Sequence, residues 1–119
     1  MSSAPDFTTW LELQDDELYS IVGSDLLGES LGIGPSDPDR SADFGRQWFA
    51  ARRRELQREV CGNPKVQQMV IHHNGDKLAE CAAVFEILGD SGIHMGSAPV
   101  VAVLIVRLGL TTFCSGYSA

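Results

Sequence analysis

The residues of this 119-residue chain that are best suited to metal chemistry are its three histidines and three cysteines. Imidazole and thiolate groups are preferred zinc ligands, and the candidate set is His72 and His73 with His94, Cys61, Cys81 or Asp76. Their spacing matches no familiar zinc motif, and adjacent histidines seldom converge on one ion. We therefore expect no metal site, and we expect the histidines to lie in a turn or to cap the preceding helix.

Covalent catalysis needs a serine or cysteine beside a base that a third group orients. Cys114 lies close to the carboxyl end, and its exposure stays open, but no pattern in the sequence pairs it with a histidine. The chain has no G-x-S-x-G elbow, no P-loop and no dinucleotide fingerprint. We expect a protein that is not an enzyme and that binds no cofactor.

The cysteines also bear on cellular location. Cys61, Cys81 and Cys114 are an odd number without C-x-x-C spacing, and no N-terminal segment has the features of a secretory signal. We predict a cytoplasmic protein whose thiols are reduced. Each cysteine lies within or beside an apolar stretch, so each is expected to be a small buried hydrophobe.

The charge is unevenly distributed along the chain. The net charge is −7, which argues against a general affinity for nucleic acid. Residues 1–40 contain nine acidic residues and one arginine, whereas residues 41–119 contain eight basic and seven acidic residues. This asymmetry indicates either an acidic surface for a basic partner or an acidic segment that folds back onto the arginines. The second interpretation needs no partner, and we favour it.

The strongest basic feature is the run Arg52, Arg53 and Arg54, with Arg46 and Arg58 nearby. Three successive arginines on a helix fan over about 200 degrees, so they do not form one compact phosphate clamp. We predict a solvated helix face that contacts protein rather than nucleic acid. The candidate interaction residues are Arg46, Arg53, Arg54 and Arg58, together with Asp15, Asp16 and Glu17. These two groups could also bind each other between subunits and give a salt-sensitive homo-oligomer.

The element that organises the rest of the chain is the apolar stretch from Ser97 to Cys114. It has neither strand alternation nor a polar helix face, so periodicity alone does not decide between a buried helix and a buried strand. Its length, a capping position at Ser97 and the early Pro99 favour a helix. Arg107 interrupts the run, and the apolar part is shorter than the about 20 residues of a membrane span. We expect a core helix and no membrane span.

The remaining pattern predicts a compact all-α bundle of about five or six helices in one domain, residues 1–119. A short helix is expected from Asp15 or Asp16, with Gly23 ending it, and a further turn follows over residues 24–31. Residues 32–41 predict a linker or loop, because glycine, proline and aspartate dominate there. It divides an acidic segment, 1–40, from the main helical core, 41–119.

Three further helix patterns occupy the second part of the chain. A helix is expected to open at Ser41, to lie across the central helix and to bury a stripe that includes Phe44 and Phe49. Asn63 and Asp76 are predicted to cap the next two helices. The second of these, over residues 76–89, should bury Leu78 on a wide apolar face.

Three segments, taken in order, resemble a known class of protein: GRQWFAARRRELQREVCGNPKV, DKLAECAAVFEILGDSG and PVVAVLIVRLGLTTFC. Together they resemble small helical accessory domains encoded beside effectors in bacterial defence and signalling operons. The resemblance covers residues 43–115, and its most specific parts are the aromatic and arginine-rich helix ending in CG and the segment VAVLIVRLGL. It implies a non-catalytic partner domain that recruits, holds or assembles an effector. No active-site residue is carried over.

We therefore predict a protein-interaction or adaptor module that self-associates or docks to a larger effector. One alternative is a regulatory domain that binds a small ligand in an apolar pocket between residues 78–88 and the central helix. Another alternative is nucleic-acid contact through the arginine-rich helix. The sequence identifies neither the partner nor the oligomeric state.

Overall fold

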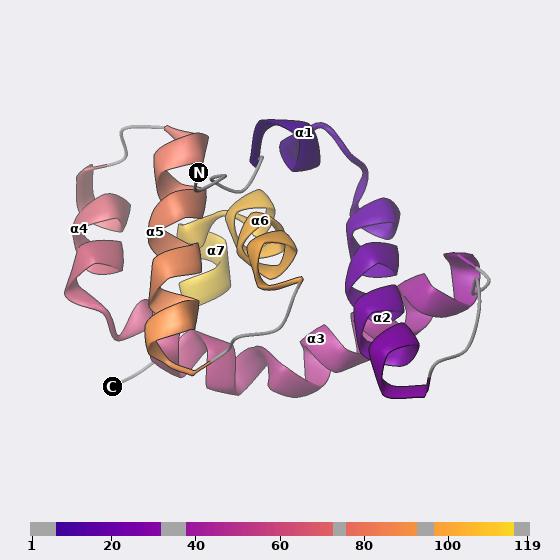
Figure 1. Ribbon diagram of the computed structural model, residues 1–119. Helices are drawn as coiled ribbons and strands as arrows, with labels where there is room; N and C mark the ends of the chain where they lie inside the picture. Colours follow the sequence, from indigo (N-terminus) through magenta and orange to yellow (C-terminus); the bar gives the residue numbers. More distant parts are fainter. Residues whose placement is uncertain (1–6, 32–37, 73–75, 93–96, 116–119) are drawn as a thin grey trace, which may run out of the picture.

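The computed structural model describes residues 7–31, 38–72, 76–92 and 97–115 and is all-α, as predicted (Figure 1). The described residues form seven helices rather than five or six. Their bounds are α1 Phe7–Leu11, α2 Asp15–Leu31, α3 Pro38–Cys61, α4 Pro64–His72, α5 Lys77–Asp90, α6 Ala98–Leu108 and α7 Leu110–Cys114. Of these, α6 lies at the centre, with α1, α2, α5 and α7 around it.

The central position of α6 follows from its composition. Every residue from Val100 to Val106 is at most 2% exposed, which confirms that this apolar run is an interior helix. The helix ends at Leu108, earlier than expected, because Gly109 takes φ = 90° and turns the chain into the separate helix α7. None of the described helices is both long and apolar enough to cross a bilayer.

Two glycines allow α2 and α3 to pack very closely. A Cβ atom on Gly23 would lie 1.8 Å from the carbonyl oxygen of Ser41, and one on Gly45 would lie 2.1 Å from that of Tyr19. The predicted helix end at Gly23 is therefore wrong, since α2 runs through it to Leu31. The glycine is placed by interhelical packing rather than by chain termination.

The long helix α3 starts earlier and packs differently from what the sequence predicts. It begins at Pro38, within the expected loop, and Ser41 is fully buried inside its first turns. The rest of that expected loop, residues 32–37, lies outside the described residues. Instead of lying mainly across the central helix, α3 makes its most extensive contact with α2. Phe44 is 39% exposed, so the predicted inward stripe is wrong at this position, although Phe49 is buried.

The caps of α4 and α5 are as predicted. The Asn63 side chain accepts a hydrogen bond from the Lys65 amide at 2.9 Å, and the Asp76 side chain accepts one from the Ala79 amide at 3.1 Å. The predicted burial of Leu78 is wrong, because this side chain is 47% exposed at the start of α5.

Candidate interaction surface

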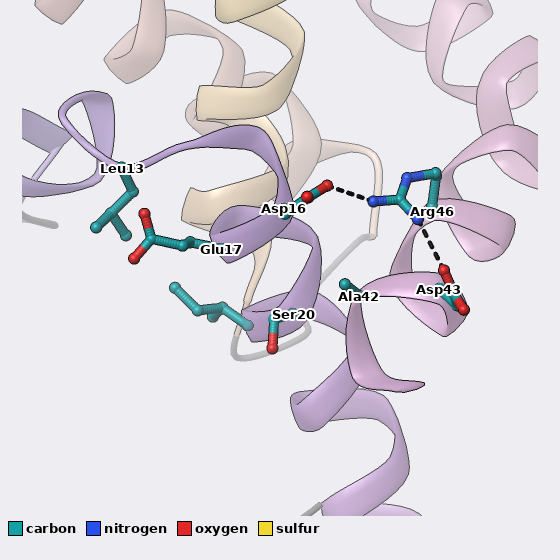
Figure 2. Close-up of a pocket in the computed structure, with 8 residues that line it drawn as sticks. Leu13, Asp16, Glu17, Ser20, Ala42, Asp43 and Arg46 are labelled. Atoms are coloured by element: carbon teal, nitrogen blue, oxygen red, sulfur yellow. Dashed lines mark hydrogen bonds and ion pairs between the residues drawn. The ribbon is translucent and has the colours of Figure 1, made fainter. Parts of the chain in front are cut away.

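The predicted acidic and basic residues meet within the chain where α2 begins. Asp16, in the first turn of α2, pairs with the Arg46 guanidinium on α3 at 2.5 Å, and Asp43 pairs with the same guanidinium at 2.9 Å (Figure 2). Both carboxylates are mostly exposed, so each pair contributes little stability, about 0–1 kcal/mol. The interhelical pair links the first turn of α2 to α3.

A second contact joins the acidic segment to the end of the central helix. Asp15 lies 3.3 Å from the Arg107 guanidinium, which also donates hydrogen bonds to the backbone carbonyls of Leu11 and Leu13. The interpretation that the acidic segment folds back onto the arginines is thus confirmed for Asp15 and Asp16. Glu17 instead accepts a hydrogen bond from the Gln14 amide at 3.0 Å and caps the start of α2.

The hollow between α2 and α3, about 720 Å³, borders these contacts (Figure 2). Its charged lining consists of Asp16, Glu17, Asp43 and Arg46. Each of these four side chains already has a charged or backbone partner inside the chain. The hollow therefore offers no unpaired charge that would select a ligand.

Two of the predicted interaction arginines pack onto aromatic rings of their own chain. The Arg46 guanidinium lies 5.2 Å from the Tyr19 ring centroid, and that of Arg53 lies 5.5 Å from the Phe113 ring centroid. Burial, reinforced by the nearby carboxylate of Asp15, raises the pKa of the Tyr19 hydroxyl, although the two arginines oppose this shift. Arg46 and Arg53 thus hold α3 against its neighbours.

The predicted arginines that remain available, Arg54 and Arg58, lie on the side of α3 opposite its buried residues. They belong to a stripe that recurs at three- and four-residue intervals and that we call the α3 outer face: Arg40, Phe44, Gln47, Ala51, Arg54 and Arg58. All six residues are exposed, and the three arginines form no ion pair with any described residue. The acids flanking this face, Asp43 and Glu55, are paired with arginines outside it.

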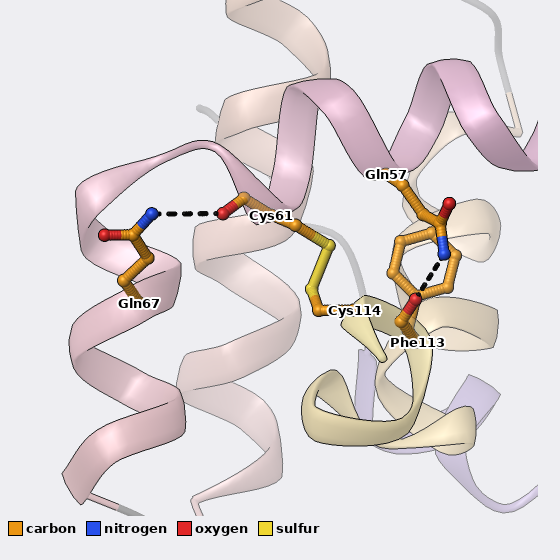
Figure 3. Close-up of a disulfide and its surroundings, with 5 residues drawn as sticks. All are labelled: Gln57, Cys61, Gln67, Phe113 and Cys114. Carbon is orange, nitrogen blue, oxygen red and sulfur yellow. Dashed lines mark hydrogen bonds between the residues drawn. A yellow bond between two sulfur atoms is a disulfide. The ribbon is translucent and has the colours of Figure 1, made fainter. Parts of the chain in front are cut away.

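The thiol prediction is wrong for two cysteines, because Cys61 and Cys114 form a disulfide across 53 residues (Figure 3). It joins the end of α3 to the end of α7, where the Gln57 side chain also donates to the Phe113 carbonyl at 2.7 Å. The Cys114 side chain is half-buried, and its sulfur atom is bonded to that of Cys61. Since disulfides persist in oxidising environments, the cytoplasmic location loses the support of reduced thiols and stays a prediction.

The third cysteine, Cys81, is fully buried and unpaired, as expected. Burial, with a smaller contribution from Glu80, raises the pKa of its thiol to about 11. At neutral pH this side chain is a protonated core residue, and thiolate chemistry at this position is suppressed.

The candidate zinc ligands do not come together within the part of the chain that the structure describes. No group of three histidine, cysteine or acidic side chains there could hold an ion. Cys61 is engaged in the disulfide, and Cys81 is isolated in the core. His73 and His94 lie outside the described residues, as does the side chain of His72.

Sequence reasoning missed the disulfide and the glycine contact. Three cysteines at separations of 20 and 33 residues do not show which two pair, because pairing depends on where α7 folds back. The signal for the glycine contact was available: a glycine inside an otherwise helical pattern often marks close packing. Gly23 and Gly45 both satisfy that description.

The chain matches no protein-family model, no curated protein and no solved structure.

Proposed function

We propose that this chain is a non-catalytic interaction module that docks an acidic helix of a larger partner protein onto the α3 outer face. The observation that carries the proposal is the exposed stripe of three arginines around Phe44, Gln47 and Ala51, without an acidic residue in it. On a chain of net charge −7, such a basic face is a local exception.

The shape of this face suits a helical partner. Arg40 and Arg58 are 18 positions apart, which corresponds to about 27 Å along a helix. Helical partners commonly bind through residues at three-, four- and seven-residue spacing, and the α3 outer face has this spacing. Phe44, 39% exposed, offers an apolar anchor near one end. Arginine and aromatic side chains are enriched among residues that dominate binding energy.

The electrostatics of the face select the charge of the partner. Asp43 and Glu55, which border the stripe, are 2.9 Å and 3.2 Å from Arg46 and Arg52. Arg46 and Arg52 therefore offset the charges of these two acids. The three arginines of the α3 outer face are left to attract the carboxylates of a partner. An acidic helix satisfies this surface better than nucleic acid, because it can pack an apolar residue on Phe44 and brings a lower density of negative charge than a phosphate backbone to a chain of net charge −7.

The predicted docking to an effector, suggested by the resemblance to bacterial accessory domains, fits this proposal and supplies the first partners to test. Proteins encoded beside this chain would be co-produced with it, and complexes would be sized by light scattering at low and high salt. We expect one such protein to bind, and the affinity to fall as salt rises.

A matched pair of variants locates the contact. Arg54→Glu reverses a charge on the α3 outer face, while Lys65→Glu makes the same change in charge on α4, away from that face. We expect Arg54→Glu to weaken binding by about 2 kcal/mol or more and Lys65→Glu to have a much smaller effect. Equal weakening by both variants would contradict docking at this face. If the chain alone formed dimers that dissociate at high salt or in the Arg54→Glu variant, that result would support self-association in place of docking to a partner.

A further inference from the structure

We propose that α7 is a redox-controlled strap, which a small dithiol releases by reducing the Cys61–Cys114 disulfide in the folded chain. Release turns α7 away from the bundle at Gly109 and uncovers Phe49 and the side chain of Gln57. This inference concerns the helix that the disulfide ties to the end of α3, and it does not depend on the proposed docking at the α3 outer face.

The disulfide is open to a small reagent. Both of its cysteines line a hollow of about 300 Å³ between α4 and the ends of α3 and α7 (Figure 3). The walls are mostly apolar, and the other lining residues are Val66, Gln67, Val70 and Ile71. Since Ile71 is 69% exposed, the hollow opens to water. At about 30 Å³ for each non-hydrogen atom, the volume accommodates an uncharged dithiol of about ten such atoms, which is larger than dithiothreitol.

The reduction is a thiol–disulfide exchange that begins at Cys114, because its side chain is half-buried whereas Cys61 is 4% exposed. A thiolate of the dithiol bonds to the Cys114 sulfur, the bond to Cys61 breaks, and its electron pair leaves on the Cys61 sulfur, which takes a proton from water. The second thiol of the dithiol then attacks the mixed disulfide, and its proton passes to the Cys114 sulfur. The dithiol is oxidised to a cyclic disulfide, and the two cysteines are reduced by two electrons.

The disulfide is the strongest anchor of α7. This helix has five residues, whereas isolated helices shorter than about 12 residues are marginal in water. No side chain caps its first turn, and none of its residues is charged. Its other anchors are the buried Leu110 and Phe113, a contact of Arg53 with the Phe113 ring, and the hydrogen bond from Gln57. The backbone entropy of the freed segment opposes these contacts, so the covalent bond decides whether α7 stays docked.

Gly109 provides the pivot for the release. Its φ of 90° separates α6 from α7, and rotation at this position moves α7 without disturbing α6. The central helix keeps its place, because α1, α2 and α5 still pack around it. Phe49 is 4% exposed, and its ring centroid lies 6.3 Å from that of Phe113. Departure of α7 therefore exposes an aromatic side chain of the core.

Alkylation after reduction tests the release, with Cys81 as an internal control. The oxidised full chain is treated with dithiothreitol in native buffer and then with iodoacetamide, and mass spectrometry locates the modified cysteines. Because Cys81 is fully buried, we expect it to react at least about a hundredfold more slowly than Cys61 and Cys114. Equal rates at all three cysteines would mean that the whole chain unfolds, and an unreduced disulfide would mean that the reagent does not reach it. Either result overturns the proposal.

Amide exchange measured by NMR distinguishes release of α7 from mere entry of the reagent into the hollow. The Phe113 amide donates a hydrogen bond to the Gly109 carbonyl at 2.8 Å. In the reduced chain, we expect the protection of this amide to fall at least about tenfold more than that of the α6 amides. The Cys61→Ser/Cys114→Ser double variant should show the same loss without reductant, whereas Cys81→Ala, which keeps the disulfide, should exchange like the unmodified chain. An equal change at Phe113 and in α6 of the reduced chain would show that α7 stays docked, and it would rule out the strap.

Discussion

Replacing Gly23 with alanine tests whether the close approach of α2 and α3 holds this fold together. The new methyl carbon would lie 1.8 Å from the Ser41 carbonyl oxygen, whereas ordinary van der Waals contact begins near 3.4 Å. The obstructing atom belongs to the backbone and cannot rotate away. The two helices must therefore separate locally by up to about 1.6 Å, the difference between these distances. That movement loosens Leu18 and Val22, which are fully buried on α2.

The size of the effect follows from two opposing contributions. Overpacking of a well-packed interior costs about 1–3 kcal/mol, and a backbone clash belongs at the upper end of that range. Alanine recovers at most about 1 kcal/mol relative to glycine within a helix. We therefore expect Gly23→Ala to lower the free energy of unfolding by about 2 kcal/mol.

Urea unfolding followed by circular dichroism measures this change, and Gly89→Ala is the matched control. Gly89 lies in α5, and a Cβ atom there would meet nothing within 4 Å. The control should be neutral or stabilising by up to about 1 kcal/mol. If Gly23→Ala proved as stable as Gly89→Ala, the argument that the glycine is required by interhelical contact would be refuted.

The two types of cysteine give further predictions. Reduction of the Cys61–Cys114 disulfide should lower the free energy of unfolding by about 4 kcal/mol, because the bond closes a loop of 53 residues in the unfolded chain. Urea unfolding with and without reductant measures this, and an unchanged midpoint would contradict it. For Cys81, the pKa of the thiol is about 11 in the folded chain, above its ordinary value of 9.0. The thiol therefore ionises first in the unfolded chain, and the free energy of unfolding should fall as pH rises from the lower to the higher value. In the Cys81→Ala variant the urea midpoint should fall less over this pH range, and identical pH profiles for the two chains would contradict the prediction.

Part of the candidate surface was predictable from residue spacing alone. The helical period places Arg54 and Arg58 on one side of α3, and both are exposed. The same period could not show that Arg46 and Arg53 lie over the rings of Tyr19 and Phe113, since those rings come from α2 and α7. A period describes one helix, whereas the use of a side chain depends on which other helix lies beside it.

Glu80 illustrates the same limit for buried residues. In the sequence it is an ordinary acidic residue in the first turn of a helix. Its burial and its place in a cavity arise only because α4 and the chain around Gly109 close over it. No local pattern contains that information.

The sequence by itself determined the all-α class, the caps at Asn63 and Asp76, and the interior position of Val100–Val106, because each depends on local backbone preference or on apolar content. Tertiary structure decided that α2 runs through Gly23, that Cys61 pairs with Cys114, and which arginines stay on the surface. These outcomes depend on distances between segments far apart in the chain, and such distances are set only when the helices pack.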